Sequence, residues 1–63
     1  MDVKKLFAYE HLPPHLQEVS EEFYKMADFI EMDFHDSAEK TLALRKLWEA
    51  KNLMVFAAAN ASE

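Results

Sequence analysis

The chain has 63 residues, just over half of them apolar (51%), and it contains no cysteine and no glycine. A chain this short buries too little surface to be stable alone without disulfides, a metal or oligomerisation, and the lack of cysteine excludes the disulfides. The net charge of −5 disfavours a protein that binds DNA, RNA or an anionic membrane, because such proteins need an electropositive face.

Residues 1–12 are predicted to form a short arm, whose apolar side chains are Leu6, Phe7 and Tyr9. The arm is too short to be a stable element alone, and we expect it to pack on the rest of the chain. It lacks the apolar stretch of a signal peptide, and no apolar run is long enough to cross a bilayer, which favours a cytoplasmic protein. Pro13 and Pro14 end the arm, and Pro14 suits the first turn of a helix.

A helix is predicted from about residue 14 to residue 34. Its apolar positions follow helical spacing: Leu16, Val19, Phe23, Met26, Ala27 and Ile30. Further apolar residues widen this face beyond what one partner helix can cover: Tyr24, Phe29, Met32 and Phe34.

A second helix is predicted over residues 37–60, with Asp36 as its N-cap and Glu39 completing a capping box. One row of this helix alternates small and large residues: Ala43, Leu47, Ala50, Met54 and Ala57. A second apolar row lies beside it: Leu44, Trp48, Val55 and Ala59. The short link between the helices predicts an antiparallel hairpin, one domain over residues 13–63. The surplus apolar surface predicts a homo-oligomeric helical bundle, although residues 57–59 could instead be a frayed alanine-rich end.

Candidates for chemistry are few. Two prolines separate His11 from His15, so these residues lack the helical spacing that a metal pair needs, and we expect no metal and no cofactor. The carboxylates Glu31, Asp33 and Asp36 are typical of a solvated turn, and no serine has a suggestively placed histidine. We therefore expect a protein that is not an enzyme.

The second helix carries one continuous polar stripe, Thr41, Arg45, Glu49 and Asn52. Such a stripe is typical of a solvent-exposed face, on which Arg45 and Glu49 form an i, i+4 pair. Alternatively, a helix N-terminus with a hydroxyl and the nearby Lys40 and Arg45 binds a small anion such as a phosphate. Tyr9 or Phe7 would then offer a flat surface to a base. The spacing leaves both interpretations open.

The stretches FAYEHLPP and SAEKTLALRKLWEAK resemble the small phage-encoded sponge proteins that sequester cyclic oligonucleotide signals of the CBASS and Thoeris defence systems. The similarity covers residues 6 to about 59 and is most specific around residues 37–50. It implies helical hairpins assembled into a compact homo-oligomer, often a hexamer, with nucleotide pockets between subunits. The implied activity is capture of a cyclic di- or trinucleotide without cleavage, in the cytoplasm of an infected bacterium.

The resemblance also implies roles for single residues. Tyr9 matches the arm tyrosine that stacks on a base, and Thr41 and Arg45 fall in the binding segment. Ser20 stands where the family has a basic residue that faces the phosphates, and Lys25 is the nearest basic group. Phe56 stands where some relatives have an arginine. Either the ligand differs, or Lys25, Lys40 or Arg45 contacts the phosphate, or binding has been lost.

Two other classes stay open at this point. A helical hairpin of this kind would use the same apolar faces to bind a host protein as an inhibitor or adaptor, and Tyr9 and Arg45 would then be dispensable. A bundle that binds RNA is a third interpretation, which the acidic charge balance disfavours.

Overall fold

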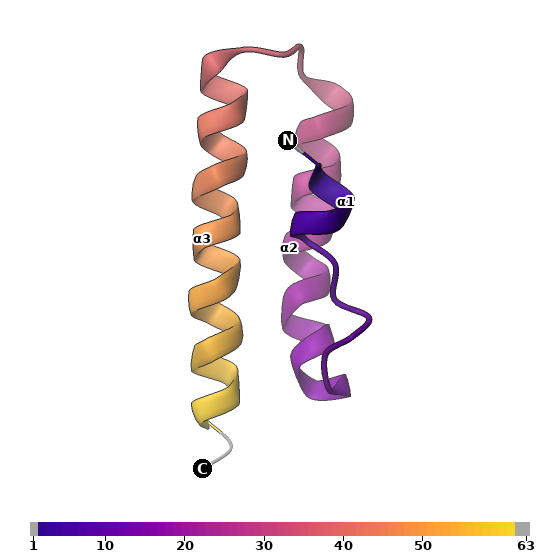
Figure 1. Ribbon diagram of the computed structural model, residues 1–63, viewed down its shortest axis with the longest axis vertical. Coiled ribbons are helices and arrows are strands. Elements are labelled where there is room, and N and C mark those ends of the chain that lie inside the picture. Colours follow the sequence, from indigo (N-terminus) through magenta and orange to yellow (C-terminus); the bar gives the residue numbers. More distant parts are fainter. Residues whose placement is uncertain (1, 62–63) are drawn as a thin grey trace.

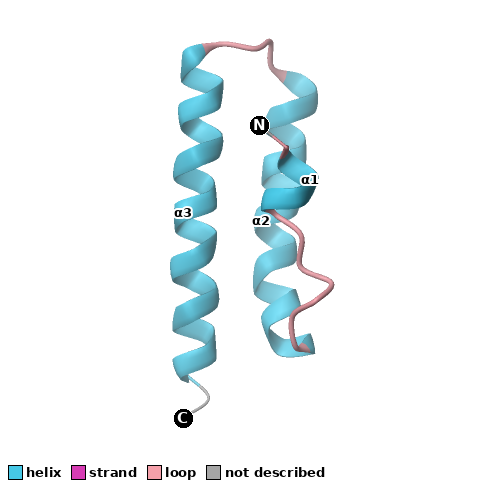
Figure 2. Ribbon diagram, viewed as in Figure 1, coloured by secondary structure: helices cyan, strands magenta, loops and turns pink. Residues whose placement is uncertain are grey.

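The protein is an antiparallel helical hairpin with a short arm packed across it, as a computed structural model describes it for residues 2–61. The elements are α1 (Val3–Leu6), α2 (Pro14–Asp33) and α3 (Ala38–Ala61), and the described residues contain no strand (Figure 1, Figure 2). The predicted all-helical hairpin is confirmed. Met1 of the predicted arm and residues 62–63 of the predicted hairpin domain lie outside the described residues.

Helix α2 begins where the proline pair predicts. Pro14 occupies the first turn, and the carbonyl of Pro13 accepts hydrogen bonds from the backbone N–H groups of Leu16 and Gln17, at 2.9 and 3.0 Å. The helix ends at Asp33, one residue earlier than predicted, because Phe34 is already extended with φ −123° and ψ 142°.

Helix α3 begins one residue later than predicted, and its cap is Ser37 rather than Asp36. The Ser37 hydroxyl accepts a hydrogen bond from the backbone N–H of Lys40 at 3.0 Å, which is the usual geometry of an N-cap. The Asp36 carboxylate instead accepts from the Lys40 ammonium, also at 3.0 Å. The capping box predicted between Asp36 and Glu39 is therefore wrong, because the helix starts at Ala38 and places Lys40 where Glu39 was expected.

The core lies where the arm, α2 and α3 meet. Val3 and Phe7 of the arm, Ala27 of α2 and Leu44 of α3 are buried together, and Phe7 is completely enclosed. Asp2 caps α1 by accepting a hydrogen bond from the backbone N–H of Lys5 at 3.2 Å. Burial of an aromatic ring contributes roughly 2–3 kcal/mol. The arm is thus a helical turn that supplies part of the core, although its length alone predicted no stable element.

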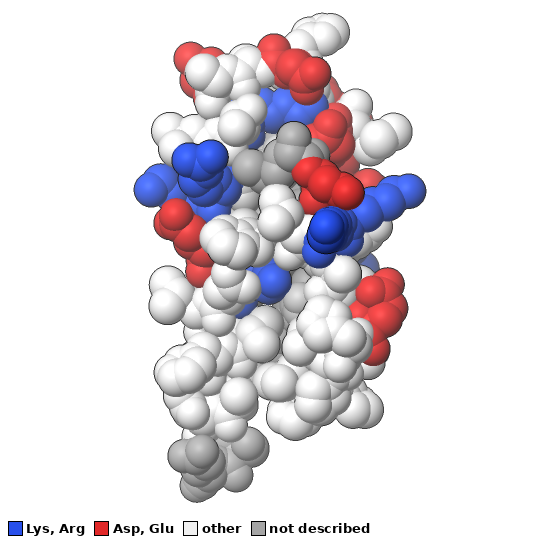
Figure 3. All heavy atoms as spheres, viewed as in Figure 1, with Lys and Arg blue, Asp and Glu red and all other residues white. Residues whose placement is uncertain are grey.

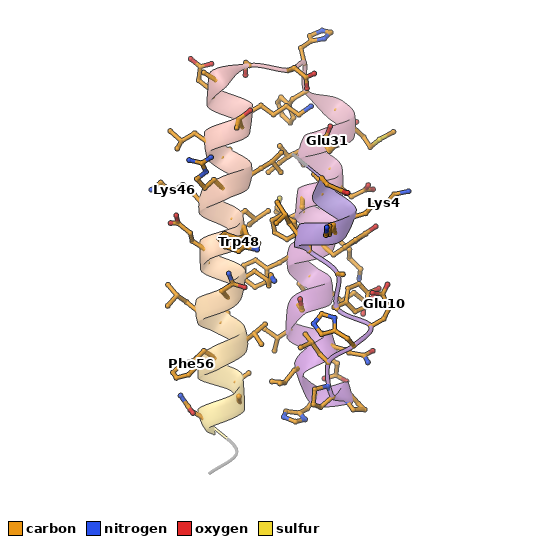
Figure 4. The ribbon with its side chains drawn as sticks, in the orientation of Figure 1. Lys4, Glu10, Glu31, Lys46, Trp48 and Phe56 are labelled. Carbon is orange, nitrogen blue, oxygen red and sulfur yellow. The ribbon has the colours of Figure 1, made fainter. Side chains whose placement is uncertain are left out.

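The two apolar rows of α3 have different environments. In the second row Leu44 is buried in the core and Trp48 packs against it, and Figure 4 shows Trp48 on the side of α2, whereas Phe56 points away from α2. In the row that alternates small and large residues, Leu47 also packs against the core, whereas Ala43 and Met54 are exposed. Several other large apolar side chains are also at least half exposed: Met26, Phe29, Met32, Phe34, Leu42, Leu53 and Phe56. The single chain therefore leaves a large apolar surface uncovered.

Candidate ligand-binding site

Tyr9 is held on the arm by contacts with α2. Its ring packs edge to face against Tyr24, with centroids 5.6 Å apart and planes at 73°. The Gln17 side chain fixes the arm by donating to the carbonyls of Leu12 at 2.7 Å and Glu10 at 3.2 Å. Both carbonyls lie within three residues of Tyr9, so these bonds hold the backbone next to the ring on α2. No feature of the sequence pattern marked Gln17 or Tyr24 for these roles.

The electrostatic environment keeps Tyr9 protonated. Partial burial, followed by the nearby carboxylates of Glu21 and Glu10, raises the pKa of the Tyr9 phenol, and Lys25 opposes this rise. A protonated phenol donates a hydrogen bond as well as offering an aromatic face. Figure 4 shows Glu10 at the outer edge of the arm, away from α3.

Lys25 is the cation beside Tyr9. Its ammonium lies 3.4 Å from the Glu22 carboxylate and 4.0 Å from that of Glu21, and its side chain is largely exposed. Exposed pairs of this kind contribute at most about 1 kcal/mol. The Lys25 ammonium can therefore leave these carboxylates for a stronger anion such as a phosphate.

Phe7 and Ser20 are both fully buried, so neither presents a surface to a ligand. Phe7 belongs to the core, and stacking on a base would require the arm to detach. Ser20 lies on the inner face of α2, and its hydroxyl has no hydrogen-bond partner among the described residues. The position that resembles the family's basic contact thus faces the interior of this chain.

Lys40 is also buried, and its ammonium is fully engaged. It donates to the carbonyl oxygens of Phe34 at 2.9 Å and Glu31 at 3.0 Å, and to the Asp36 carboxylate at 3.0 Å. A lysine ammonium has three protons, and these three bonds use them all. Lys40 therefore joins the start of α3 to the end of α2 and has no donor left for a ligand.

Thr41 and Arg45 lie together on the exposed side of α3. Both line a shallow depression whose other walls include Asp36 and Leu42. The Arg45–Glu49 pair predicted from spacing does not form, since the Glu49 carboxylate lies 3.9 Å from the ammonium of Lys46 and no ion pair of Arg45 occurs within residues 2–61. The Arg45 guanidinium is consequently available to an anion.

The structure thus arranges four of the predicted site residues in two groups at the surface, in which Tyr9 is half-buried and the other three residues are exposed. Tyr9 and Lys25 form an arm group on α2, and Thr41 and Arg45 form an α3 group near the turn. No hydrogen bond or ion pair among residues 2–61 joins the two groups. In Figure 3 charged side chains gather on the upper and middle parts and the flanks of the face shown, while the described residues of the last turns of α3, at its lower end, carry no charge.

Residues 2–61 contain no cluster of three or more histidine, cysteine, aspartate or glutamate side chains that could hold a metal ion. Within the same range, no helix has the length and apolar character needed to cross a membrane. No family model, curated protein or solved structure matches the chain.

Proposed function

We propose that this protein is a homo-oligomeric sponge that captures a cyclic di- or trinucleotide immune signal and keeps it from its effector without cleaving it. The observation that carries the proposal is the position of two polar groups at the surface, the half-buried Tyr9 with the exposed Lys25, and the exposed Thr41 with Arg45, on a chain with a large uncovered apolar surface. The resemblance of residues 6–59 to phage-encoded sponges supplies the class of ligand.

The apolar surface supports self-association. Leu53 and Phe56 of α3 are about two-thirds exposed, at 69% and 67%, and Met32 of α2 is 74% exposed. Exposure of so many large apolar side chains favours an interaction surface in a soluble protein. The α3 row with Ala43, Ala50 and Ala57 lets a second helix approach closely, because alternating small and large residues interdigitate.

The two polar groups suit the chemistry of a cyclic oligonucleotide. Such a ligand carries flat bases and anionic phosphates, which call for an aromatic face and for arginine or lysine donors. Tyr9 offers the aromatic face, and Lys25 and Arg45 are the exposed cations beside a phenol and a hydroxyl. Since one chain keeps these groups apart, we infer that a pocket closes when the groups of different subunits meet.

Affinity also favours a pocket between subunits. A sponge that outcompetes an effector responding to nanomolar signal needs about −12 kcal/mol of binding free energy. The depression beside Thr41 and Arg45 is open to solvent and encloses too little of a ligand to supply that energy. Enclosure by two or more subunits supplies it by desolvating the bases and fixing the phosphates.

The test is a ligand panel on the purified protein. Cyclic di- and trinucleotides and ADP-ribose-derived signals are added in turn, and the melting temperature is recorded, because a ligand that binds the folded state must raise it. We expect one class of cyclic oligonucleotide to raise it, and the same nucleotide to be recovered intact after heat denaturation. A chain whose melting temperature no member shifts would contradict the proposal.

Neighbouring residues provide matched variants for this panel. Arg45→Ala should lose most of the ligand-induced shift, because it removes a phosphate donor. Lys46→Ala removes an adjacent exposed cation that already pairs with Glu49, and it should keep the shift. Equal shifts in both variants would exclude Arg45 from the site.

A second candidate function is binding of a host protein as an inhibitor or adaptor. The observation that favours it is the exposure of three methionines, Met26, Met32 and Met54, since methionine-rich surfaces adapt to varied partners. Under this function Tyr9 and Arg45 are dispensable, and no nucleotide changes the melting temperature.

A further inference from the structure

The turn between α2 and α3 joins the helices through one buried cation. Helix α2 has no basic residue in its last turn, so its final carbonyls need a donor from elsewhere. Lys40 supplies this donor from α3, at 3.0 Å from the Glu31 carbonyl oxygen and 2.9 Å from that of Phe34. Its side chain is only 7% exposed, although lysine is rarely buried.

The same ammonium pairs with the negative charges of two carboxylates. The Asp36 side chain, 97% exposed, accepts a hydrogen bond from it at 3.0 Å, and the Glu31 carboxylate lies 3.6 Å away. The bond from Lys40 lowers the pKa of the Asp36 carboxyl, so Asp36 is a carboxylate at neutral pH. Asp36 therefore places a negative charge on the surface, and Lys40 offsets it.

Asp36 also lines the depression that holds Thr41 and Arg45. An anion that enters this depression meets the Arg45 guanidinium and, in the same wall, a carboxylate. Without a counter-ion, that carboxylate would repel a phosphate, and the repulsion near a protein surface is worth about one power of ten in affinity.

We propose that Lys40 is a positioning residue of the ligand site, which acts through Asp36 by binding its carboxylate and cancelling its charge so that a phosphate is accepted at Thr41 and Arg45. This role depends on the proposed capture of a nucleotide. Lys40 itself does not touch the ligand, although its place beside Thr41 in the sequence favoured direct contact.

The test compares Lys40→Met with two double variants by calorimetry, using the cyclic nucleotide that stabilises the wild type most. One double variant adds Asp36→Asn to Lys40→Met, and the other adds Glu39→Gln. Lys40→Met keeps the length of the side chain and should weaken binding roughly tenfold, because Asp36 loses its counter-ion. Adding Asp36→Asn should restore affinity to within about threefold of the wild type, since it removes the repelling charge. Lys40→Met and its double variant with Asp36→Asn should both melt at a lower temperature than the wild type, because each lacks the Lys40 bonds to the α2 carbonyls.

Glu39→Gln in the Lys40→Met background is the matched control. Glu39 is an acidic residue of the same turn, but it lies in the wall of a different hollow, with Ile30 and Ala43. The substitution removes the same amount of charge and should leave binding as weak as in Lys40→Met. Restoration by Glu39→Gln as full as that by Asp36→Asn would overturn the proposal.

The remaining outcomes separate this role from the proposed function. If the wild type binds a nucleotide and Lys40→Met binds it equally well, or if Asp36→Asn restores nothing, Lys40 has a structural role only and the sponge function stands. If the wild type gives no heat with any nucleotide of the panel, both the function and the role of Lys40 are wrong.

Discussion

Lys40 and Asp36 make the stability of the hairpin depend on pH at both ends of the scale. The Lys40 bond holds the pKa of Asp36 below its ordinary value of 3.8, and the same bond, with Glu31, raises the pKa of Lys40 above 10.5. Asp36 therefore stabilises the folded state above pH 3.8, and this contribution is lost as the pH falls through its folded pKa. The contribution of Lys40 is present below pH 10.5 and is lost as the pH rises through its own folded pKa.

Asp36→Asn tests the acid side of this dependence. The variant should be less stable than the wild type at pH 6, and the difference between the two should shrink as the pH falls below about 3.8, because protonation then removes the same charge from the wild type. Urea titrations at fixed protein concentration across this range measure it. Parallel curves at every pH would contradict the prediction.

Ser37, the N-cap of α3, also contributes to the stability of the turn. Ser37→Ala removes the hydroxyl that accepts the Lys40 backbone N–H at 3.0 Å, and it should cost about 1 kcal/mol of unfolding free energy. In a domain of this size that loss lowers the melting temperature by about 4–8 °C. Ser37→Asp is the control, since aspartate also caps helices, and it should retain most of the stability.

Among the elements, the arm contributes more to the stability of the fold than its short length suggests. Phe7 is fully enclosed among Val3, Ala27 and Leu44, so Phe7→Ala should cost about 3–5 kcal/mol and detach the arm. Trp48, the one tryptophan, packs against this cluster, so its fluorescence should shift to longer wavelength in the Phe7→Ala variant. Lys4→Ala, an exposed change on the same turn, should alter neither stability nor fluorescence.

The two long helices were predictable because their apolar residues recur with helical spacing and because Pro14 marks a start. Helix α2 ends one residue earlier than predicted because Phe34 is extended, and α3 begins one residue later because Ser37 rather than Asp36 is its cap. The arm helix was missed because one turn is unstable alone, and the burial of Val3 and Phe7 against α2 and α3 stabilises it.

The candidate site was predictable only in part. Lys25, Thr41 and Arg45 are exposed, as a binding role requires, and their places on the outer faces of the helices predict this, whereas Tyr9 is half-buried against Tyr24. Phe7 and Lys40 have the right chemistry but are buried. Spacing could not reveal this, because the arm that encloses Phe7 and the carbonyls that hold Lys40 belong to other elements.

At the scale of the whole molecule, assembly is the property to test. Ala50→Arg places a long charged side chain in the α3 row that alternates small and large residues, and under the proposed function it should dissociate the oligomer and abolish nucleotide binding with it. Asn52→Arg introduces the same side chain two residues on, in the exposed polar stripe, and should change neither. Light scattering and calorimetry on both variants measure the two effects.

Two results would contradict this link between assembly and affinity. Undiminished nucleotide binding by a dissociated Ala50→Arg variant would show that one chain suffices. A stable wild-type particle of 7.4 kDa would show that the apolar surface does not serve self-association.

The buried Lys40 ammonium at the turn also determines where the hairpin opens locally. A hairpin fastened at one end opens from the other, so hydrogen exchange should be slowest in amides around Ala27 and Leu44 and fastest in the last turns of α3. Where neighbouring subunits cover those last turns, their amides exchange slowly as well. Dilution should then expose the amides of these last turns first. The rate at which they exchange with deuterium would measure the fraction of monomeric chains.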